Sequence, residues 1–256
     1  TPVHTSESVK GEIEFDHVSF AYQEAGVNVL TDISFKAKKG QTIAVIGSTG
    51  SGKSTLINLI PRYYDVTKGS VKVDGVDVRD MTQKELRDKL GYVPQKGVLF
   101  SGTIDSNIRY GKPEITDAQV KEAAEVAQAT EFIDTKPKKY ESPVSQGGTN
   151  VSGGQKQRLS IARAIAKDPE IFIFDDSFSA LDFKTDSQLR KALKEYTKDA
   201  TTVIVAQRIS TILGADQIIV LDDGHMAGIG THKELMANCE VYQQIARSQL
   251  SEEELA

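Results

Sequence analysis

A glycine-rich octapeptide, GSTGSGKS at residues 47–54, has the clearest chemistry in the sequence. It fits the pattern G-x-x-x-x-G-K-[ST], in which glycines let backbone N–H groups converge on phosphate oxygens. Lys53 can reach the β- and γ-phosphates of a nucleotide, and the Ser54 hydroxyl can bind Mg²⁺. The sequence therefore predicts a nucleotide site. Its candidate binding residues are Gly47, Ser48, Thr49, Gly50, Ser51, Gly52, Lys53, Ser54 and Thr55.

A carboxylate that could share the magnesium ion follows the apolar run IFIF at residues 171–174. The run predicts a buried strand, so Asp175 would lie at the carboxyl edge of a sheet, where P-loop proteins hold Mg²⁺. An acidic residue at a strand end can also be an ordinary cap. Because a P-loop is present in the same chain, the metal role is the favoured interpretation.

Between these two stretches, residues 151–155 read VSGGQ. In this order the motif resembles the signature of the ATP-binding cassette (ABC) family, usually LSGGQ, with Val in place of Leu. The motif precedes a predicted helix, whose first N–H groups can bind an anion. The resemblance implies that this anion is the γ-phosphate held by a second cassette, so that a dimer is the catalytic unit. The residues concerned are Ser152, Gly153, Gly154 and Gln155.

Other positions match the same family over about residues 11–245. The resemblance implies that Tyr22 stacks on adenine, that Gln95 contacts Mg²⁺ and the attacking water, and that Asp182 belongs to the D-loop. The implied cofactors are ATP and Mg²⁺. The stretch VLFSGTI at residues 98–104, followed by Asn107 and Ile108, resembles multidrug and lipid exporters. The implied metal ligands are Ser54, Gln95 and Asp175.

Besides the Val in the signature motif, three positions depart from the family pattern. Asp176 stands where the family usually has Glu as general base, Gln207 where it usually has His, and Gln146 where exporters usually have Glu. One methylene less withdraws the Asp176 carboxylate by about 1.5 Å, and a misplacement of about 1 Å can cost ~10²-fold in rate. The catalytic candidates are therefore Asp176, Gln207 and Gln95, in a chain that resembles the degenerate-site half of a heterodimeric exporter. A fully active homodimeric cassette is the alternative.

These residues need a scaffold of strands alternating with helices. Apolar patterns predict strands at 11–22 (with one slip in register), 29–36, 41–46, 171–174, 202–206 and 217–221, and a hairpin at 71–78. Helices are predicted at 53–62, 116–127, 153–167 and within 233–256, the second of them capped by Thr116. The alternation predicts an α/β fold with a largely parallel sheet, interrupted by a mostly helical stretch at 82–168. The resemblance implies a P-loop NTPase ABC cassette, with a RecA-like α/β core, an antiparallel β subdomain and an inserted α-helical subdomain.

Composition limits the class of protein. The chain has 256 residues, 39% of them hydrophobic and 26% charged, which indicates a soluble globular fold. Its net charge of −5 gives no general electrostatic reason to bind nucleic acid, so no nucleic-acid partner is expected. The one cysteine, Cys239, cannot form an internal disulfide, which fits a reducing compartment.

We expect a linker at residues 1–10, an ATP-binding domain at 11–245 with a helical subdomain at about 82–168, and an acidic tail at 246–256. The chain starts at Thr, and no apolar run approaches the ~18–20 residues that span a bilayer. We therefore expect a piece of a longer polypeptide that carries transmembrane domains, with the cassette on the cytoplasmic face of the plasma membrane and a non-identical second cassette as partner. Two alternatives to an exporter cassette are a soluble ABC ATPase that acts on ribosomes or DNA and a regulatory module that senses ATP. Transmembrane helices upstream of this chain would distinguish the exporter from both.

Overall fold

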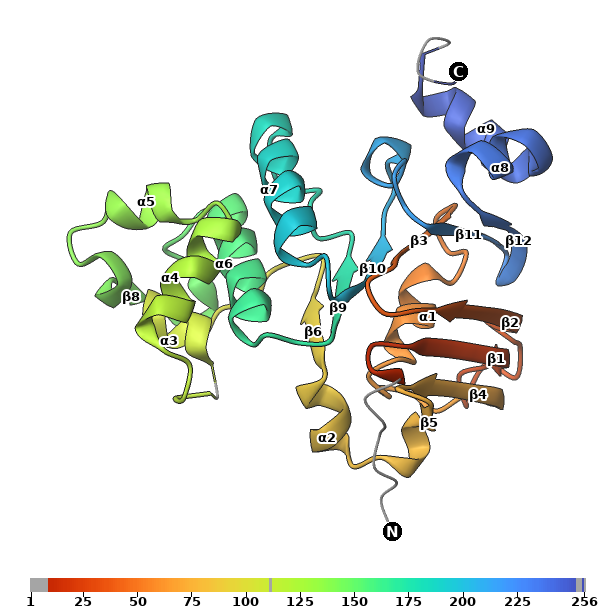
Figure 1. Cartoon of the computed structure of the whole chain (residues 1–256), viewed down its shortest axis with the longest axis horizontal. Helices are drawn as coiled ribbons and strands as arrows, with labels where there is room; N and C mark the ends of the chain where they lie inside the picture. The colour runs from red at the N-terminus through yellow and green to blue at the C-terminus, as the bar shows by residue number, and fades with distance from the viewer. Residues whose placement is uncertain (1–8, 111, 252–254, 256) are drawn as a thin grey trace. The chain divides into compact units, whose positions relative to one another are not determined.

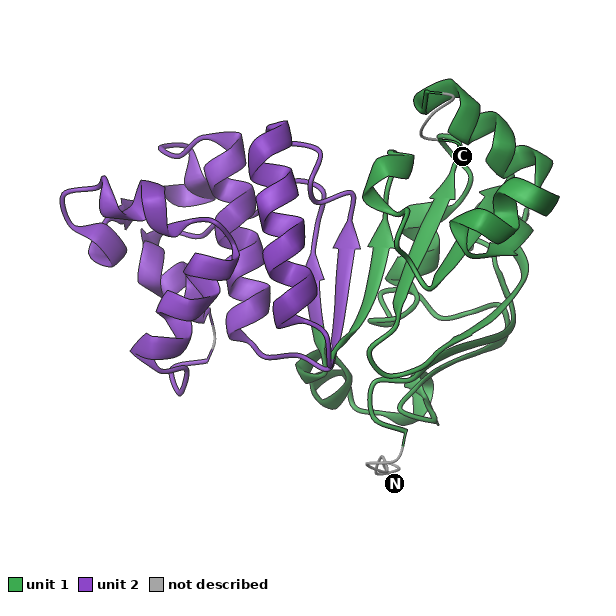
Figure 2. Ribbon diagram, turned by 45° about the horizontal axis from the view of Figure 1, so that its top comes forward, with its two compact units in different colours: residues 1–90, 200–256 green, residues 91–199 purple. Residues whose placement is uncertain are grey.

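The computed structural model describes residues 9–110, 112–251 and 255. The chain forms two compact units (Figure 2): unit 1 is Thr1–Leu90 with Ala200–Ala256, and unit 2 is Gly91–Asp199. The helical stretch expected at about 82–168 straddles this boundary, so the extent of a helical subdomain stays a prediction. The expected linker lies outside the described residues except for its last two, and the acidic tail is described only as far as residue 251 and at residue 255.

An antiparallel sheet in unit 1 has the strand order β2-β1-β4-β5 (Figure 1). Its strands are β1 (Ile13–Phe20), β2 (Leu30–Ala37), β4 (Lys68–Val73) and β5 (Val76–Asp77). The predicted slip in register is confirmed, because the pairing of β1 with β2 shifts between Phe15 and Val18. His17 lies in this bulge with φ 46°, and the extra residue keeps Val18 on the buried face.

The predicted hairpin joins β4 to β5. Its turn residues Asp74 and Gly75 both have positive φ, 53° and 75°, as a two-residue hairpin turn that matches the twist of the strands requires. The Asp74 carboxylate is buried, and it accepts hydrogen bonds from the Gly11 N–H at 2.6 Å and the Lys89 ammonium at 2.9 Å. The turn therefore also fastens the start of β1.

A parallel core in unit 1 places the glycine-rich loop. Strand β3 (Thr42–Gly47) lies between β10 (Thr201–Val205) and β11 (Gln217–Asp222), parallel to both, and β12 (His225–Gly230) pairs antiparallel with β11. Residues 43–46 are fully buried. This confirms the prediction from their continuous apolar run, which is typical of a strand covered on both faces. Because β3 ends at Gly47, the loop begins at the carboxyl edge of this sheet.

The helices of unit 1 are α1 (Lys53–Asn58), α2 (Gln83–Asp88), α8 (His232–Asn238) and α9 (Glu240–Gln249), with single 3₁₀ turns at Val78–Asp80 and Ile209–Thr211. The prediction of a helix over residues 53–62 was wrong at its C-terminal end. Helix α1 stops at Asn58, and Arg62 adopts a positive φ of 59° in the turns that follow. Pro61 has no N–H to continue the helical bonding, so the chain turns before it rather than at it.

Unit 2 is mainly helical, with short strands. Its helices are α3 (Ile104–Arg109), α4 (Asp117–Val126), α5 (Thr130–Asp134), α6 (Gly153–Ala166) and α7 (Phe183–Tyr196), with 3₁₀ turns at Lys139–Glu141 and Gln146–Gly148. Its strands are β6 (Leu90–Val93), β7 (Gly102–Thr103), β8 (Pro143–Val144) and β9 (Ile171–Asp175). The sequence analysis missed β6 and α7. Strand β6 has four residues, too few to show a period, and α7 buries few apolar side chains, chiefly Leu189 and Leu193.

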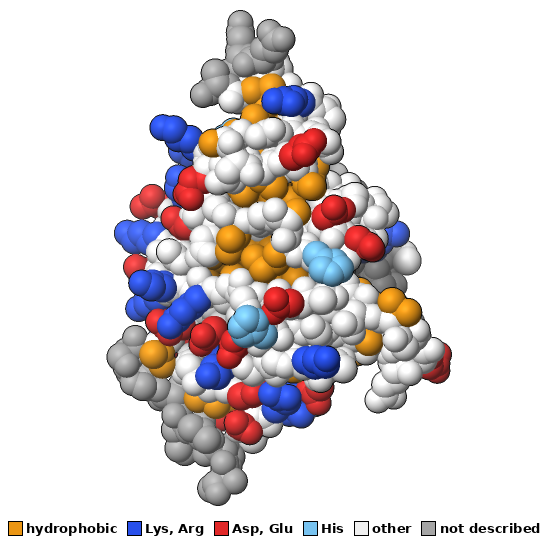
Figure 3. All heavy atoms as spheres, turned by 90° about the vertical axis from the view of Figure 1, so that its right-hand side faces the viewer, with side chains coloured by type: hydrophobic (Ala, Val, Ile, Leu, Met, Phe, Trp, Pro, Cys, Tyr) orange, Lys and Arg blue, Asp and Glu red, His pale blue; other side chains and the backbone are white. Residues whose placement is uncertain are grey.

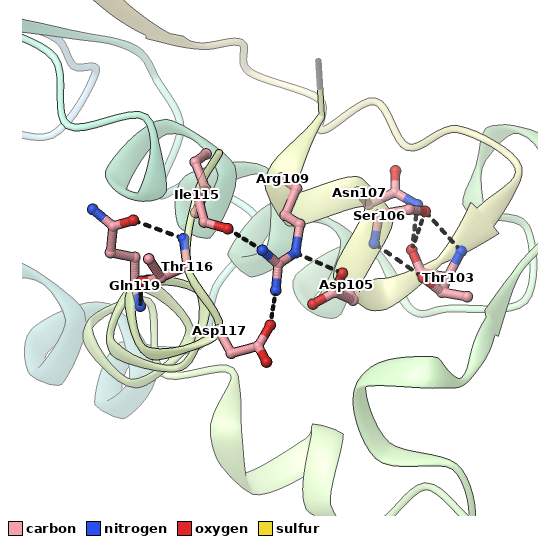
Figure 4. A network of polar contacts seen from close by, with 9 residues as sticks. All are labelled: Thr103, Asp105, Ser106, Asn107, Arg109, Ile115, Thr116, Asp117 and Gln119. Carbon is pink, nitrogen blue, oxygen red and sulfur yellow. Dashed lines mark hydrogen bonds and ion pairs between the residues drawn. The ribbon is translucent and has the colours of Figure 1, made fainter. Parts of the chain in front are cut away.

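The predicted cap of α4 is confirmed and belongs to a polar network (Figure 4). Thr116 accepts from the Gln119 N–H at 3.2 Å, and the Gln119 side chain accepts from the Thr116 N–H at 2.8 Å. On α3, Arg109 donates to Asp105 on its own helix and to both the Ile115 carbonyl and the Asp117 carboxylate before and at the start of α4. This arginine therefore fixes the end of α3 against the beginning of α4.

The part of the chain that the structure describes holds no helix long and apolar enough to cross a membrane. The face seen in Figure 3 carries acidic and basic side chains interspersed, with apolar side chains exposed towards its centre. Mixed charge of this kind is ordinary for a globular surface.

Candidate nucleotide-binding site

The glycine-rich loop lies between the end of β3 and the first turn of α1, as the motif requires. Among the hydrogen bonds that hold its backbone are those from the Ser51 N–H to the Ser48 carbonyl (3.1 Å) and from the Gly224 N–H to the Ser51 carbonyl (3.0 Å). Gly50 and Gly52 have positive φ values of 78° and 101°. These conformations suit glycine and let the loop wrap around a space next to the helix N-terminus.

The glycines of this loop differ in what a side chain would meet. A Cβ at Gly47 would lie 2.4 Å from the Leu221 carbonyl oxygen, and a Cβ at Gly52 would lie 2.8 Å from the Leu30 side chain. A Cβ at Gly50 would meet nothing within 4 Å. The loop thus packs tightly against β11 and β2 on one side and is open on the other, which fits a cradle for phosphate groups.

The Lys53 ammonium lies over this loop. It donates to the Gly47 carbonyl at 2.6 Å and to the Ser48 carbonyl at 3.1 Å. Ser48, Thr49 and Ser54 are exposed. The loop therefore presents a cation, hydroxyl groups and a helix N-terminus to the same exposed region, which is the donor set that a nucleoside triphosphate with Mg²⁺ needs.

Tyr22 lies beside α1 in the same unit. Its hydroxyl is 3.1 Å from the Thr55 hydroxyl, and the rings of Phe20 and Tyr64 meet it edge-on at centroid distances of 4.8 and 5.3 Å. Its side chain is 37% exposed. A ring that packs at right angles to its neighbours and is partly open to solvent can stack on a base. The sequence analysis did not find Tyr64, since no motif marks it.

Gln207 follows the end of β10 and is exposed. Its backbone carbonyl accepts from the Nε2 of Gln249 at 2.8 Å. Gln249 lies at the end of α9, and the sequence analysis missed it because nothing in the sequence links residues 42 positions apart.

In unit 2 the structure brings Gln95 and Asp176 together. Asp176 follows the last residue of β9, Asp175, and adopts a positive φ of 49°. The Gln95 Nε2 donates to Asp176 Oδ2 at 3.3 Å. The next residue, Ser177, donates its buried hydroxyl to the Val93 carbonyl at 2.7 Å, which ties the end of β9 to the end of β6.

The segment that carries Gln95 also packs on helix α6. Gln157, whose side chain is 1% exposed, donates to the Pro94 carbonyl at 3.0 Å. A Cβ on Gly97 would lie 2.6 Å from the Ser160 hydroxyl and 2.9 Å from the Lys156 carbonyl. The signature helix therefore contacts the Gln95 segment directly, through a glutamine that the sequence analysis did not single out.

The signature motif forms the N-terminus of α6. Ser152 accepts from the Gln155 N–H at 3.1 Å, and the Gln155 side chain accepts from the Ser152 N–H at 3.3 Å, a reciprocal cap. A Cβ on Gly153 would meet nothing within 4 Å, whereas one on Gly154 would contact the Ala180 carbonyl at 3.8 Å. The open side of the motif is thus at Gly153.

Asp182 caps α7 by accepting from the Thr185 N–H at 2.8 Å and the Thr185 hydroxyl at 2.9 Å. The hydrogen bond from the Thr185 N–H is the main reason that the pKa of Asp182 is lowered from its ordinary value. Gln146, the position where exporters usually carry Glu, is exposed. Both residues are accessible to a partner.

Comparison with known proteins shows which family the chain belongs to. The ABC transporter family profile matches residues 30–179. A protein of Staphylococcus aureus (strain NCTC 8325 / PS 47) named as a multidrug export ATP-binding/permease protein is 47% identical over 236 residues, which cover 92% of this chain and 41% of that protein. An uncharacterized ABC transporter ATP-binding protein of Mycobacterium bovis is 47% identical over 251 residues, 97% of this chain and 43% of its own length.

Among solved structures, a bacterial Atm1-family ABC exporter with ATP bound superposes with a TM-score of 0.92 at 37% identity, over 98% of this chain and 44% of that one. The chain belongs to the ABC transporter family, and its fold is that of the family's ATPase cassette. It spans less than half the length of the curated relatives that it matches.

Proposed function

We propose that the chain is the ATP-binding domain of an exporter, in which binding and hydrolysis of ATP at a dimer of cassettes drive outward transport of a substrate. The names of the similar proteins support this, since one is a multidrug export ATP-binding/permease protein and another is an exporter with ATP bound. The transmembrane domains would belong to the same polypeptide, because the chain covers 41% of the relative that also carries a permease. The cassette would then lie at the cytoplasmic face of the membrane.

Unit 1 would hold the nucleotide. The loop N–H groups and Lys53 would bind the phosphates, and Tyr22 would stack on adenine. The resemblance to the family assigns Mg²⁺, which neutralises phosphate charge when bound, to Ser54, Gln95 and Asp175. The open side of the loop at Gly50 supports the binding of phosphate, and the partial exposure of the Tyr22 ring supports stacking. Ser54 is exposed, and its hydroxyl is an oxygen donor of the kind that magnesium prefers.

The signature motif of unit 2 would serve the nucleotide of a second cassette. The capped N-terminus of α6 offers N–H groups and the positive end of the helix dipole, and Gly153 leaves it open. With Ser152 and Gln155 bonded to each other, the motif is ordered before any phosphate arrives. Preorganised donors lose little entropy when they bind.

The chain's own site would hydrolyse ATP slowly, and the second cassette would be a non-identical one. The observation that carries this proposal is the state of Asp176: the carboxylate is one methylene short of the glutamate usual in the family, and Gln95 donates to it. Part of its capacity as a base for water is therefore occupied. Gln207 stands where the family usually has a histidine that contacts the γ-phosphate, so its side chain would face that phosphate, but it cannot become cationic. Two weakened groups on one ATP are best explained by a pair in which the partner supplies the competent Glu and His.

Substitutions at Asp176 test this function. In the chain paired with its partner, Asp176→Asn should change steady-state ATPase by less than about 3-fold, because the base that it removes is already badly placed. Asp176→Glu in the chain alone should raise hydrolysis about 10²-fold, since the longer side chain recovers the missing ~1.5 Å. The measurement is steady-state release of phosphate, with ATP binding checked separately.

A fully active homodimeric cassette is the second candidate, favoured by the near-normal signature motif and its intact cap. That enzyme would respond in the opposite way. Rapid hydrolysis by the wild-type chain alone, together with a loss of about 10² or more on Asp176→Asn, would replace the heterodimer with the homodimer.

A further inference from the structure

Helix α9 is hydrogen-bonded to the loop that carries Gln207. The side chain of Gln249, the last residue of α9, donates from Nε2 to the Gln207 carbonyl at 2.8 Å and accepts at Oε1 from the Ile209 N–H at 2.8 Å. Both halves of one amide are therefore used on two backbone groups that flank a single residue. All three residues belong to unit 1.

Helix α9 is itself firmly anchored. Tyr242 is fully buried, and its hydroxyl lies 2.6 Å from Nδ1 of His232 on α8. Burial raises the pKa of Tyr242 to about 12, so this hydroxyl stays neutral at physiological pH. Tyr242 and Ala246 share one buried cluster with Ile209. Gln249 is thus presented by a fixed element that packs on the same loop.

The backbone around Gln207 is fixed from two sides. Before it, the Ala206 N–H still bonds to the Val45 carbonyl of β3 at 3.2 Å. After it, the Ile209 N–H is held by Gln249. Without the glutamine, the Gln207 carbonyl and the Ile209 N–H would lose the partner that ties them to α9.

We propose that Gln249 is a positioning residue, which fixes the backbone of residues 207–209 so that the Gln207 side chain faces the γ-phosphate of the nucleotide on this chain's own loop. The inference rests on the role of Gln207 in the function proposed above. It extends that role to a helix that follows every motif of the family, and it makes α9 part of the nucleotide site.

Equilibrium binding of two nucleotides tests it without any need for turnover. The probes are Mg-ADP, which lacks the γ-phosphate, and the Mg complex of the β,γ-imido analogue of ATP. Gln249→Met keeps the length of the side chain and removes both hydrogen bonds. We expect the affinity for the imido analogue to fall about 3- to 10-fold, the size of one or two lost hydrogen bonds, and the affinity for ADP to change by less than about 2-fold. Equal effects on both nucleotides, or no effect on either, would overturn the proposal.

Gln243→Met is the matched control. Gln243 lies on the same helix and donates the same kind of bond, from Nε2 to the Met236 carbonyl at 2.8 Å, but that carbonyl belongs to α8 rather than to the Gln207 loop. The control should leave the ratio of the two affinities unchanged. If it lowers the ratio as much as Gln249→Met does, the effect comes from the packing of α9 and not from positioning.

A double-mutant cycle separates this inference from the role of Gln207. Gln207→Ala should lower the affinity for the imido analogue by itself, and adding Gln249→Met to it should lower it no further. If Gln207→Ala lowers that affinity and Gln249→Met does not, the proposal for Gln249 alone is wrong. If Gln207→Ala has no effect, the proposed role of Gln207 is wrong and the positioning role falls with it.

Gln249→Glu supplies a conservative rescue. A protonated carboxyl can donate to the Gln207 carbonyl and accept from the Ile209 N–H as the amide does, whereas the ionised form can only accept. Relative to wild type at each pH, the preference of this variant for the imido analogue over ADP should therefore rise as the pH falls towards about 4–5, where a glutamate protonates. If the preference of Gln249→Glu relative to wild type does not change with pH, the two hydrogen bonds of residue 249 do not position Gln207.

Discussion

The sharpest test of the cassette dimer is Gly153→Asp. Gly153 is the first residue of α6, after the cap residue Ser152, and a Cβ there would meet nothing within 4 Å. Its φ is not in the left-handed region, so an aspartate is accommodated without strain. An acidic residue in the first turn stabilises a helix by about 0.3–1 kcal/mol. The fold should therefore tolerate this change or gain slightly from it.

The loss should appear only where a phosphate approaches the helix from outside. A carboxylate on Gly153 would stand about 4–6 Å from a phosphate oxygen bound by this helix end, and at an effective dielectric constant near 20 the repulsion is about 3–4 kcal/mol. That corresponds to a loss of roughly 10²- to 10³-fold in the turnover of the pair. Gly153→Asn, which has the same shape without the charge, should lose far less, on the order of 10-fold.

The assay is steady-state ATPase of the chain with its partner, together with binding of ATP to the chain alone. Binding alone should be unchanged, because the proposed role of the signature motif is to serve the nucleotide of the second cassette and not the one on this chain's own loop. The reasoning would be refuted if Gly153→Asp kept more than about a third of wild-type turnover, or if Asn and Asp were equally damaging. Thermal unfolding of each variant controls for stability.

Two further predictions concern the chain's own loop. Tyr22→Ala should weaken ATP binding about 5- to 100-fold, because that is the usual contribution of one stacked base. Lys53→Ala should weaken ATP binding more. If a binding titration detects no effect of either variant, their proposed roles are contradicted. Gly52→Ala should reduce ATP affinity at least 10-fold more than Gly50→Ala, because both residues have positive φ but only at Gly52 would the Cβ collide, 2.8 Å from Leu30; equal losses would show that backbone strain alone decides.

Local patterns predicted most of the scaffold. The bulge in β1, the Asp74–Gly75 turn and the Thr116 cap each depend on a few neighbouring residues, and the structure contains all three. The elements that were missed lack such signals. Strand β6 is held partly by the buried Ser177 hydroxyl on the Val93 carbonyl, a contact between residues 84 positions apart. No local pattern can show a bond of that kind.

The candidate site shows the same division. Its motif residues were found because their spacing follows from how a loop binds phosphate. The residues that orient them were not found, because Gln157 and Gln249 act through single side chains on distant backbone carbonyls. A glutamine on a helix is usually a solvated residue. Gln157 differs from such residues by its burial and its partner, whereas Gln249 is exposed and differs only by the two backbone groups that it bonds.

The geometry of Asp176 suggests why a shorter acid is tolerated there. The residue has a positive φ of 49°, a conformation that costs most residues about 1–2 kcal/mol and that aspartate adopts more readily than most. A glutamate at this position would carry the base further towards water but would strain the backbone more. In a pair whose partner supplies the competent base, this chain no longer needs the longer side chain of glutamate, but it still gains stability from the lower backbone strain of aspartate. Asp176→Glu should therefore raise hydrolysis and slightly lower the midpoint of thermal unfolding, and a variant that gained both activity and stability would show that backbone strain has no part in the choice of aspartate.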